Sequence, residues 1–379
     1  MKKVLIIAGE ASGDLHAAAL VREVHKQTPS VAFYGVGSTR MREAGVNLLA
    51  DASEIAVVGI TEVLTHVGSI YRVYARIKDF LRSERPDMLI LVDFPDFNLL
   101  VGRVAKKLDI PIVYYISPQV WAWRKGRIRT IAKLVKTMLV VFPFEVELYR
   151  QEGVPVQFVG HPLIDSVRSE LSVEEARHRI GLDPRKRTVA ILPGSRKKEI
   201  DTLLEDMLGA VQLLAERHED LQFVLPVAPT ITAKYIRSFT ERCPVPVRLS
   251  EGKVYDVLRA SDAAIVVSGT ATLETGLMGV PMVIIYRVSR LTAFLVKMLA
   301  TYDHVGLVNI VADRRIVPEL VQEEVTAGNI STALSAILSD PARKRTMKED
   351  LAAVRSRLGD SGASRKAAEI VLRQLGGTL

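Results

Sequence analysis

Two distant segments of the chain share one local pattern: a buried strand, a turn of small residues and the start of a helix. The first is the apolar run 3–8 followed by GEASGD at 9–14, and the second is the run 263–267 followed by SGTATLE at 268–274. In such a unit, free backbone N–H groups and the helix dipole point into the turn and attract anions. The pattern predicts two Rossmann-like α/β domains that face each other across a cleft and hold a negatively charged ligand.

The order of apolar segments along the 379-residue chain is typical of α/β proteins with parallel sheets. The chain is too long for one ordinary core and long enough for two. We expect a first domain at 1–165, a second at 166–359, and a C-terminal helix at 360–379 that packs back on the first. The expected strands are 3–8, 31–35, 88–92, 112–116 and 138–142 in the first domain, and 188–192, 222–226, 246–249, 263–267 and 281–285 in the second.

The charge distribution argues against a dedicated nucleic-acid-binding domain. Residues 1–165 contain 21 basic and 17 acidic residues and the remainder contains 30 and 26, so the two parts share the net charge of +8 equally. A basic stripe confined to one domain, as nucleic-acid binding favours, is therefore not expected. The excess fits anionic ligands or an anionic membrane surface.

Cysteine usage and the N-terminal sequence bear on the cellular compartment. The single cysteine, Cys243, leaves no disulfide framework and indicates a reducing compartment. The short apolar run behind Lys3 ends before Glu10, so we expect a first strand there rather than a signal peptide. No segment approaches the roughly 18 uncharged apolar residues of a spanning helix. These features predict a cytoplasmic protein that can lie against a membrane.

Three segments, at 60–81, 124–136 and 290–299, place basic residues on helical patterns. The ordinary interpretation is helices that cover a sheet and expose a charged face. The alternative is contact with a lipid surface, where apolar side chains meet acyl chains and basic side chains meet phosphates. The sequence leaves both interpretations open.

The turn at 9–14 lacks the third glycine of a dinucleotide fingerprint and the lysine of a Walker loop. Its unusual residue is Glu10, a carboxylate at a helix start where an anion would otherwise bind. Glu10 either stabilises the helix dipole or belongs to a ligand site, because ligands of open α/β sheets bind at the carboxyl ends of strands.

Asp93 directly follows the buried run 88–92, at the carboxyl end of a predicted strand. Partial burial at such a position raises the pKa of a carboxyl group toward that of a usable base. Asp96 lies three residues later, where we expect it to cap the next helix. Of the two, Asp93 is the candidate for catalysis.

In the second domain, Arg196 is the only charged residue of the tight turn that follows the strand at 188–192. Its guanidinium suits a diphosphate, and the alternative is a surface ion pair with Glu199. The turn at 268–270 offers hydroxyl and N–H groups. Glu274, about one turn later, either accepts hydrogen bonds from ribose or stabilises the helix dipole.

A metal site is not expected. The seven histidines show no metal-ligand spacing, and no Asp-x-Asp pair is present to hold a divalent ion on a sugar nucleotide. Trp121 and Trp123 follow another predicted strand end. Buried packing is the ordinary interpretation for both, and stacking on a sugar is the alternative.

Six segments together resemble the lipid A disaccharide synthases, which are glycosyltransferases of the GT-B fold. They are GEASGD at 9–14, DFPDFN at 93–98, SPQVWAWR at 117–124, GHP at 160–162, LPGSR at 192–196 and SGTATLE at 268–274. The segments follow the family's order, and VN at 308–309 and PE at 318–319 resemble later family segments. Each motif is modest by itself, but six in order are highly specific.

The resemblance implies a reaction. A 2,3-diacylglucosamine unit passes from UDP to the 6-hydroxyl of 2,3-diacylglucosamine 1-phosphate, which gives a β-1,6-linked disaccharide 1-phosphate and UDP. Family analogy places the acceptor in the first domain and the UDP-sugar in the second. It implies an inverting displacement that needs neither a metal nor a cofactor.

The expected catalytic residues are Asp93 as the base, Glu10 as its partner or substitute, and His16 as a weaker candidate. The expected substrate-binding residues belong to the matched segments: Ser12, Gly13, Gly194, Ser195, Arg196, Ser268, Gly269, Thr270, Glu274 and Asn309.

Lipid substrates imply peripheral attachment to the anionic inner leaflet of the inner membrane in a Gram-negative cell. A homodimer is possible, and the sequence does not decide the oligomeric state. One alternative is another UDP-GlcNAc-using enzyme, such as a MurG-like transferase or a non-hydrolysing epimerase. The segments at 93–98 and 121–124 argue against it. The other alternative is a non-catalytic module that binds a nucleotide or a lipid without turnover.

Overall fold

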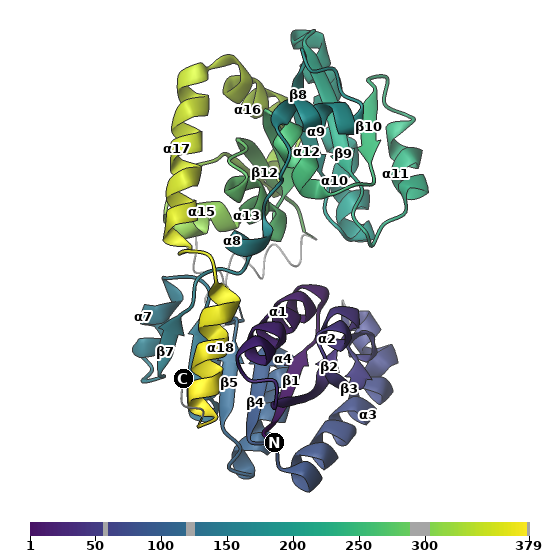
Figure 1. Cartoon of the computed structure of the whole chain (residues 1–379). Coiled ribbons are helices and arrows are strands. Elements are labelled where there is room, and N and C mark those ends of the chain that lie inside the picture. Colours follow the sequence, from purple (N-terminus) through teal and green to yellow (C-terminus); the bar gives the residue numbers. More distant parts are fainter. Residues whose placement is uncertain (56–59, 119–125, 289–303, 377–379) are drawn as a thin grey trace. The chain divides into compact units, whose positions relative to one another are not determined.

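A computed structural model describes residues 1–55, 60–118, 126–288 and 304–376 of the chain (Figure 1). Internal contacts divide the chain into two units. Unit 1 comprises Met1–Pro162 together with Leu358–Leu379, and unit 2 comprises Leu163–Arg357. These limits differ by a few residues from the domain boundaries expected from the sequence.

Unit 1 contains a seven-stranded parallel sheet in the order β3-β2-β1-β4-β5-β6-β7. All five residues of β4 are buried, as are five of the six residues of β1. Strands of this kind occur where helices cover both faces of a parallel sheet. The strand bounds are β1 (Lys3–Ala8), β2 (Ala32–Gly37), β3 (Asn47–Asp51), β4 (Met88–Val92), β5 (Ile112–Tyr115), β6 (Thr137–Val140) and β7 (Val156–Phe158).

The helices of unit 1 include one from the C-terminal part of the chain. Figure 1 shows α18, in yellow, among the purple and blue elements of this unit. It packs against α1, and Gln374 Nε2 donates to Thr137 Oγ1 at 2.5 Å, at the start of β6. The bounds are α1 (Ala11–Gln27), α2 (Thr39–Glu43), the short 3₁₀ turn η1 (Ala52–Glu54), α3 (Ile60–Glu84), α4 (Pro95–Lys107), α6 (Gly126–Leu134), α7 (Glu145–Arg150) and α18 (Ala363–Gln374).

Helix α3 covers the sheet over the part whose side chains are described. Val73, Ile77 and Leu81 are completely buried in the core, whereas Tyr71 is 69% exposed. Residues 68–84 thus cover the sheet, as the ordinary interpretation expects, and lipid contact of their exposed face stays a prediction. Among the helices of the described residues, none has the length and apolar character needed to cross a bilayer.

Asp14 joins two helices of unit 1. Its buried carboxylate accepts hydrogen bonds from the backbone N–H groups of Ser38 at 2.6 Å, Arg40 at 3.1 Å and Met41 at 3.3 Å. These N–H groups lie at the start of α2 and have no partner within that helix. The acid of the GEASGD segment therefore fixes the loop after β2.

Unit 2 repeats the architecture with a six-stranded parallel sheet in the order β10-β9-β8-β11-β12-β13. Its strands are β8 (Arg187–Leu192), β9 (Leu221–Pro226), β10 (Val247–Ser250), β11 (Ala263–Val267), β12 (Met282–Tyr286) and β13 (Glu319–Val321). Its helices are α8 (Leu163–Ser166), α9 (Val173–Ile180), α10 (Lys197–Arg217), α11 (Ala233–Thr240), α12 (Val254–Ala260), α13 (Thr270–Leu277), α15 (Leu307–Ala312), α16 (Ala327–Ser339) and α17 (Pro341–Arg357), with the 3₁₀ turn η2 (Gln322–Glu324).

All ten expected strands are present, and three short strands were missed: β3, β7 and β13. Each of the three lies at one edge of its sheet. Edge strands are less buried than central ones, and none of these three forms a continuous apolar run. The hydrophobic pattern that identified the central strands is therefore absent from them.

Replacing Asp14 with alanine should destabilise unit 1 by about 2 kcal/mol, because it leaves buried N–H groups at the start of α2 without an acceptor. Thermal unfolding should show a lower Tm. Glu23→Ala is the matched control on the same helix, since the one ion pair of Glu23 with the described residues is that with Lys26 near the surface. Equal effects of the two changes would contradict the assigned role of Asp14.

Candidate active site

The acids Glu10 and Asp93 lie at one edge of the sheet of unit 1. Ala8 at the end of β1 pairs with Val92 at the end of β4; Asp93 directly follows β4, and Glu10 follows β1 after Gly9. Because the strands are parallel, their carboxyl ends meet at the same edge. The negative charge of Glu10 accordingly acts on the Asp93 carboxyl group.

The pKa of Asp93 is raised from 3.8 to about 6. Burial is the main cause, the charge of Glu10 adds to it, and a hydrogen bond from the Phe94 N–H opposes it. A carboxyl group with this pKa is ionised at neutral pH and is a stronger base than an ordinary aspartate. These properties suit a general base.

His16 is a weaker base than Asp93. Burial lowers the pKa of His16 to about 4, and burial together with His16 lowers the pKa of His161 to about 3. Both imidazoles are therefore neutral at physiological pH. His161 also packs against the ring of Phe142, with centroids 5.0 Å apart.

The backbone at Asp93 has an unusual conformation. Asp93 has φ 44° and Phe94 has φ 47°, so two consecutive residues other than glycine are left-handed. Each costs roughly 1–2 kcal/mol. The Phe94 ring packs directly on Gly9, where a Cβ atom would overlap the ring, so a glycine is required in the turn after β1.

The remaining residues of the first turn have different surroundings. Glu10 is exposed at the N-cap position of α1, and its side chain makes no capping hydrogen bond. Ser12 is exposed, whereas Gly13 is buried against Ala8 and lets the helix approach the strand closely. A ligand can therefore reach the side chains of Glu10 and Ser12, whereas Gly13 is buried between the helix and the strand.

The expectation that Asp96 caps the following helix was wrong. Phe94 occupies the N-cap position of α4, and Asp96 lies in its first turn. The Asp96 side chain is 82% exposed and forms an ion pair with Arg127. The left-handed turn at 93–94 starts the helix earlier than the sequence pattern indicated.

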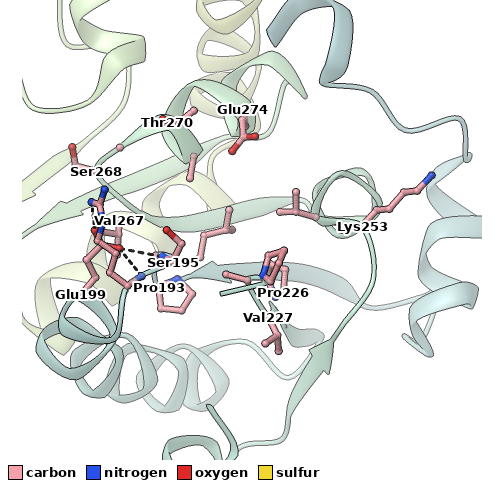
Figure 2. Close-up of a pocket in the computed structure, with 18 of the residues that line it drawn as sticks. Pro193, Ser195, Glu199, Pro226, Val227, Lys253, Val267, Ser268, Thr270 and Glu274 are labelled. Atoms are coloured by element: carbon pink, nitrogen blue, oxygen red, sulfur yellow. Dashed lines mark hydrogen bonds and ion pairs between the residues drawn. The ribbon is translucent and has the colours of Figure 1, made fainter. Parts of the chain in front are cut away.

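Unit 2 contains a pocket of about 490 Å³ at the carboxyl end of its sheet. Figure 2 shows Thr270 and Glu274 on one side of the pocket and Pro193, Ser195, Pro226 and Val227 on the other, with the amine of Lys253 pointing away. Pro226 and Val227 thus give the pocket an apolar part, and Thr270 and Glu274 give it a polar part across from them. A flat apolar group and a polar or charged one can bind there together.

Arg196 and Glu199 form the pair that the sequence offered as an alternative. Arg196 Nη1 lies 3.1 Å from Glu199 Oε1, and Glu199 Oε2 accepts from the backbone N–H groups of Ser195 at 3.1 Å and Arg196 at 3.3 Å. Gly194, at φ 97°, leaves room for this carboxylate, because a Cβ atom there would overlap it. A carboxylate of the protein thus occupies the donors of the turn.

The second turn retains unoccupied space. Gly269 and Thr270 are exposed, and no atom of the described residues lies within 4 Å of a Cβ atom placed on Gly269. The Ser268 hydroxyl donates to Val305 O at 2.6 Å, so its hydrogen is already used. Glu274 accepts from Tyr255 Oη at 2.8 Å, and burial raises the pKa of Glu274.

Asn309 does not line this pocket. It is completely buried, and its amide donates to Val317 O at 3.0 Å and to Glu319 Oε1 at 2.8 Å. Its Oδ1 accepts from the N–H groups of Ile316 and Val317. Because these partners use the whole amide, Asn309 and Glu319 fix the loop before β13 in this structure rather than offer a free group to a ligand.

Sequence reasoning missed the wall of the pocket formed by residues 226–229 and by Val254, as well as the partner of Glu274, Tyr255. The available signal was the position of PVAP at 226–229, at the carboxyl end of an expected strand. Trp121, Trp123 and the helical pattern at 290–299 lie outside the described residues, as do Arg124 and Lys125.

The family described as lipid-A-disaccharide synthetase matches residues 4–373. The chain belongs to this family. A lipid-A-disaccharide synthase of Geobacter sulfurreducens is 50% identical over 374 residues, which are 99% of this chain and 97% of the relative. Relatives of the same name from Syntrophus aciditrophicus and Nitrosococcus oceani are 49% and 43% identical, each over at least 98% of this chain and 96% of the relative.

Membership in the lipid-A-disaccharide synthase family makes the chain a glycosyltransferase of lipid A disaccharide synthesis. This confirms the family predicted from the six motifs, and it goes against a non-catalytic module.

Solved structures agree with the predicted fold. MurG of Acinetobacter baumannii has a TM-score of 0.62 at 13% identity, with 98% of this chain and 100% of that chain covered. A UDP-GlcNAc 2-epimerase from Neisseria meningitidis, bound to UDP-GlcNAc, has a TM-score of 0.67 at 14% identity, with 98% and 100% covered. Together with the two parallel sheets, these similarities show the two-domain GT-B fold of the lipid-A-disaccharide synthase family.

Replacing Asp93 with asparagine should stabilise the protein at pH 8 but not at pH 4. The carboxyl pKa is higher in the folded state, at about 6, than its ordinary value of 3.8, so folding stability falls as the pH rises between these values. Above pH 6 the buried charge costs about 1–3 kcal/mol, which Asp93→Asn removes.

The measurement is urea unfolding at both pH values. Asp79→Asn, at an exposed position of α3, controls for the loss of one negative charge. A stability difference that does not change with pH would contradict the burial of the Asp93 charge.

Proposed function

We propose that this enzyme transfers 2,3-diacylglucosamine from UDP to the 6-hydroxyl of 2,3-diacylglucosamine 1-phosphate, with inversion and without a metal ion. The single observation that carries the proposal is the position of Asp93 at a strand end, with a pKa of about 6. Asp93 is the base that takes the proton of the acceptor hydroxyl. Glu10 supports it by raising its pKa.

The pocket of unit 2 is the proposed donor site. The apolar side with Pro226 and Val227 suits the flat face of uracil, and Glu274 suits the ribose hydroxyls because Tyr255 uses only one of its oxygens. Gly269 and Thr270 lie at the start of α13, where the first N–H groups have no partner within the helix, and such groups suit a diphosphate. This assignment also draws on the epimerase of the same fold, whose structure contains UDP-GlcNAc.

The proposed chemistry moves one proton and one sugar. The acceptor oxygen attacks the anomeric carbon while Asp93 takes its proton, and the bond from that carbon to the diphosphate oxygen breaks. UDP leaves with the electron pair. Arg196 and the turn at 268–270 stabilise the charge that develops on the diphosphate, after the guanidinium has exchanged Glu199 for the ligand.

The test is UDP release from UDP-2,3-diacylglucosamine, with and without 2,3-diacylglucosamine 1-phosphate, in the presence of EDTA. Wild type should release UDP only with the acceptor, and its kcat/KM should fall as the pH drops below about 6, where Asp93 becomes protonated. Asp93→Asn should lose at least about a hundredfold in kcat, as expected for a general base.

Arg196→Ala is the comparison variant in the donor site, and it should raise the KM for the donor. Full activity of Asp93→Asn would refute the role of this residue as the base. A requirement for a divalent ion after EDTA treatment would refute the metal-independent mechanism.

The proposed location is the surface of an anionic membrane. The lipid substrates require it, and α3 presents Tyr71 next to the exposed Arg72, with Arg76 one turn further on. An aromatic ring among arginines suits the boundary between acyl chains and headgroups.

Co-sedimentation with vesicles that contain phosphatidylglycerol should show binding at low salt and release at high salt. Tyr71→Ser should weaken binding severalfold, since the exposed aromatic ring is lost. Val173→Ser removes an exposed apolar side chain of unit 2 and is the control. The membrane assignment fails if the wild type stays in the supernatant at low salt.

A further inference from the structure

The carbonyl oxygen of Asp93 accepts two short hydrogen bonds from side chains. Tyr114 Oη donates to it at 2.6 Å, and Asn98 Nδ2 donates to it at 2.7 Å. Asn98 Nδ2 also lies 3.2 Å from Val92 O, so the amide spans the last residue of β4 and the first residue after it.

The two donors come from elements that are fixed independently. Tyr114 lies in the middle of the sheet on β5, paired with Leu91 of β4, and its side chain is completely buried. Asn98 lies in α4 and is also completely buried. A rigid strand and a rigid helix therefore hold the same carbonyl group from two sides.

The backbone of Asp93 needs this support. Asp93 and Phe94 are both left-handed, with φ near 45°, which side chains other than glycine disfavour. The Asp93 N–H makes only long contacts, at 3.4 Å to Tyr115 O and 3.3 Å to Ile116 O. The short bonds to the carbonyl group are thus the strongest attachment of the turn.

The side-chain oxygen of Asn98 gives a second indication that this residue is kept for its amide nitrogen. Its Oδ1 is buried and has no hydrogen-bond partner among the described residues. A buried polar atom without a partner is unfavourable, and an apolar side chain of similar size would avoid it. The two bonds that the amide nitrogen donates account for an asparagine at this position.

We propose that Asn98 and Tyr114 are positioning residues that hold the backbone of Asp93 in its left-handed conformation, so that its carboxyl group stays in place for proton transfer. Neither residue acts on the substrate itself. The inference rests on the proposed role of Asp93 as the base.

The experiment compares Tyr114→Phe with Tyr149→Phe. The first change removes one bond to Asp93 O. The second removes a similar buried bond, 2.7 Å between Tyr149 Oη and Ser117 Oγ, which does not involve Asp93. Both variants are measured for Tm, kcat, KM of the nucleotide sugar, and the pH dependence of kcat/KM.

Tyr114→Phe should lower kcat by about tenfold or more, because a displaced catalytic group loses its alignment. The KM of the donor should stay unchanged, since the donor pocket belongs to unit 2. The acidic limb of the pH profile of kcat/KM should move from about pH 6 to lower pH. A carboxyl group that is released toward water returns toward its ordinary pKa. Tyr149→Phe should leave the limb in place.

Asn98→Leu is the second variant and should shift the limb in the same direction. A carbon-13 NMR titration of the Asp93 carboxyl group follows the shift without turnover. If Tyr114→Phe and Asn98→Leu fold and titrate like Tyr149→Phe, the positioning role is wrong. If Asp93→Asn stays active, the role of Asp93 as the base fails instead, which the activity assay separates from the titration.

Discussion

The parallel pairing of β1 with β4 is the constraint on which the site of unit 1 depends. The register aligns Ala8 with Val92, so that the residues after both strands leave the sheet at one edge. Both strands are buried in the core, which strongly specifies their register. Two acids that are separated by more than eighty residues in the chain thereby act on each other electrostatically.

Unit 2 has the same strand-end geometry, but its turns carry hydrogen-bond donors and a cation instead of carboxylates. Val266 of β11 pairs with Leu192 of β8, so the turns at 193–196 and 268–270 open at one edge. The turn at 268–270 supplies N–H donors and Arg196 supplies a guanidinium, whereas the corresponding edge of unit 1 carries carboxylates. In the proposed function, equivalent positions in two similar domains thus bind an anionic group in one case and provide a proton acceptor in the other.

The sequence predicted the features that depend on long buried patterns. The central strands, the turns after them and the positions of Asp93 and Glu274 follow from apolar runs and strand ends. It failed where tertiary contacts decide the outcome. The edge strands β3, β7 and β13 have no such run, and Phe94 rather than Asp96 takes the N-cap position of α4. The buried hydrogen bond of Asn309 to Glu319 could not be read from the sequence either, and the expected contact of Asn309 with the donor stays a prediction. Tyr114 stands in an apolar strand pattern like its neighbour Tyr115, and only the structure shows where its hydroxyl group points.

The return of α18 to unit 1 has a consequence for biosynthesis. The unit that contains the first strand also needs residues 363–374, which a ribosome makes more than three hundred residues later. Unit 2 is continuous from Leu163 to Arg357, so all of its residues have been synthesised before unit 1 is complete. The order of completion is therefore the reverse of the usual N-terminal-first order. While translation continues, the surface of α1 that α18 will cover stays exposed to chaperones and proteases.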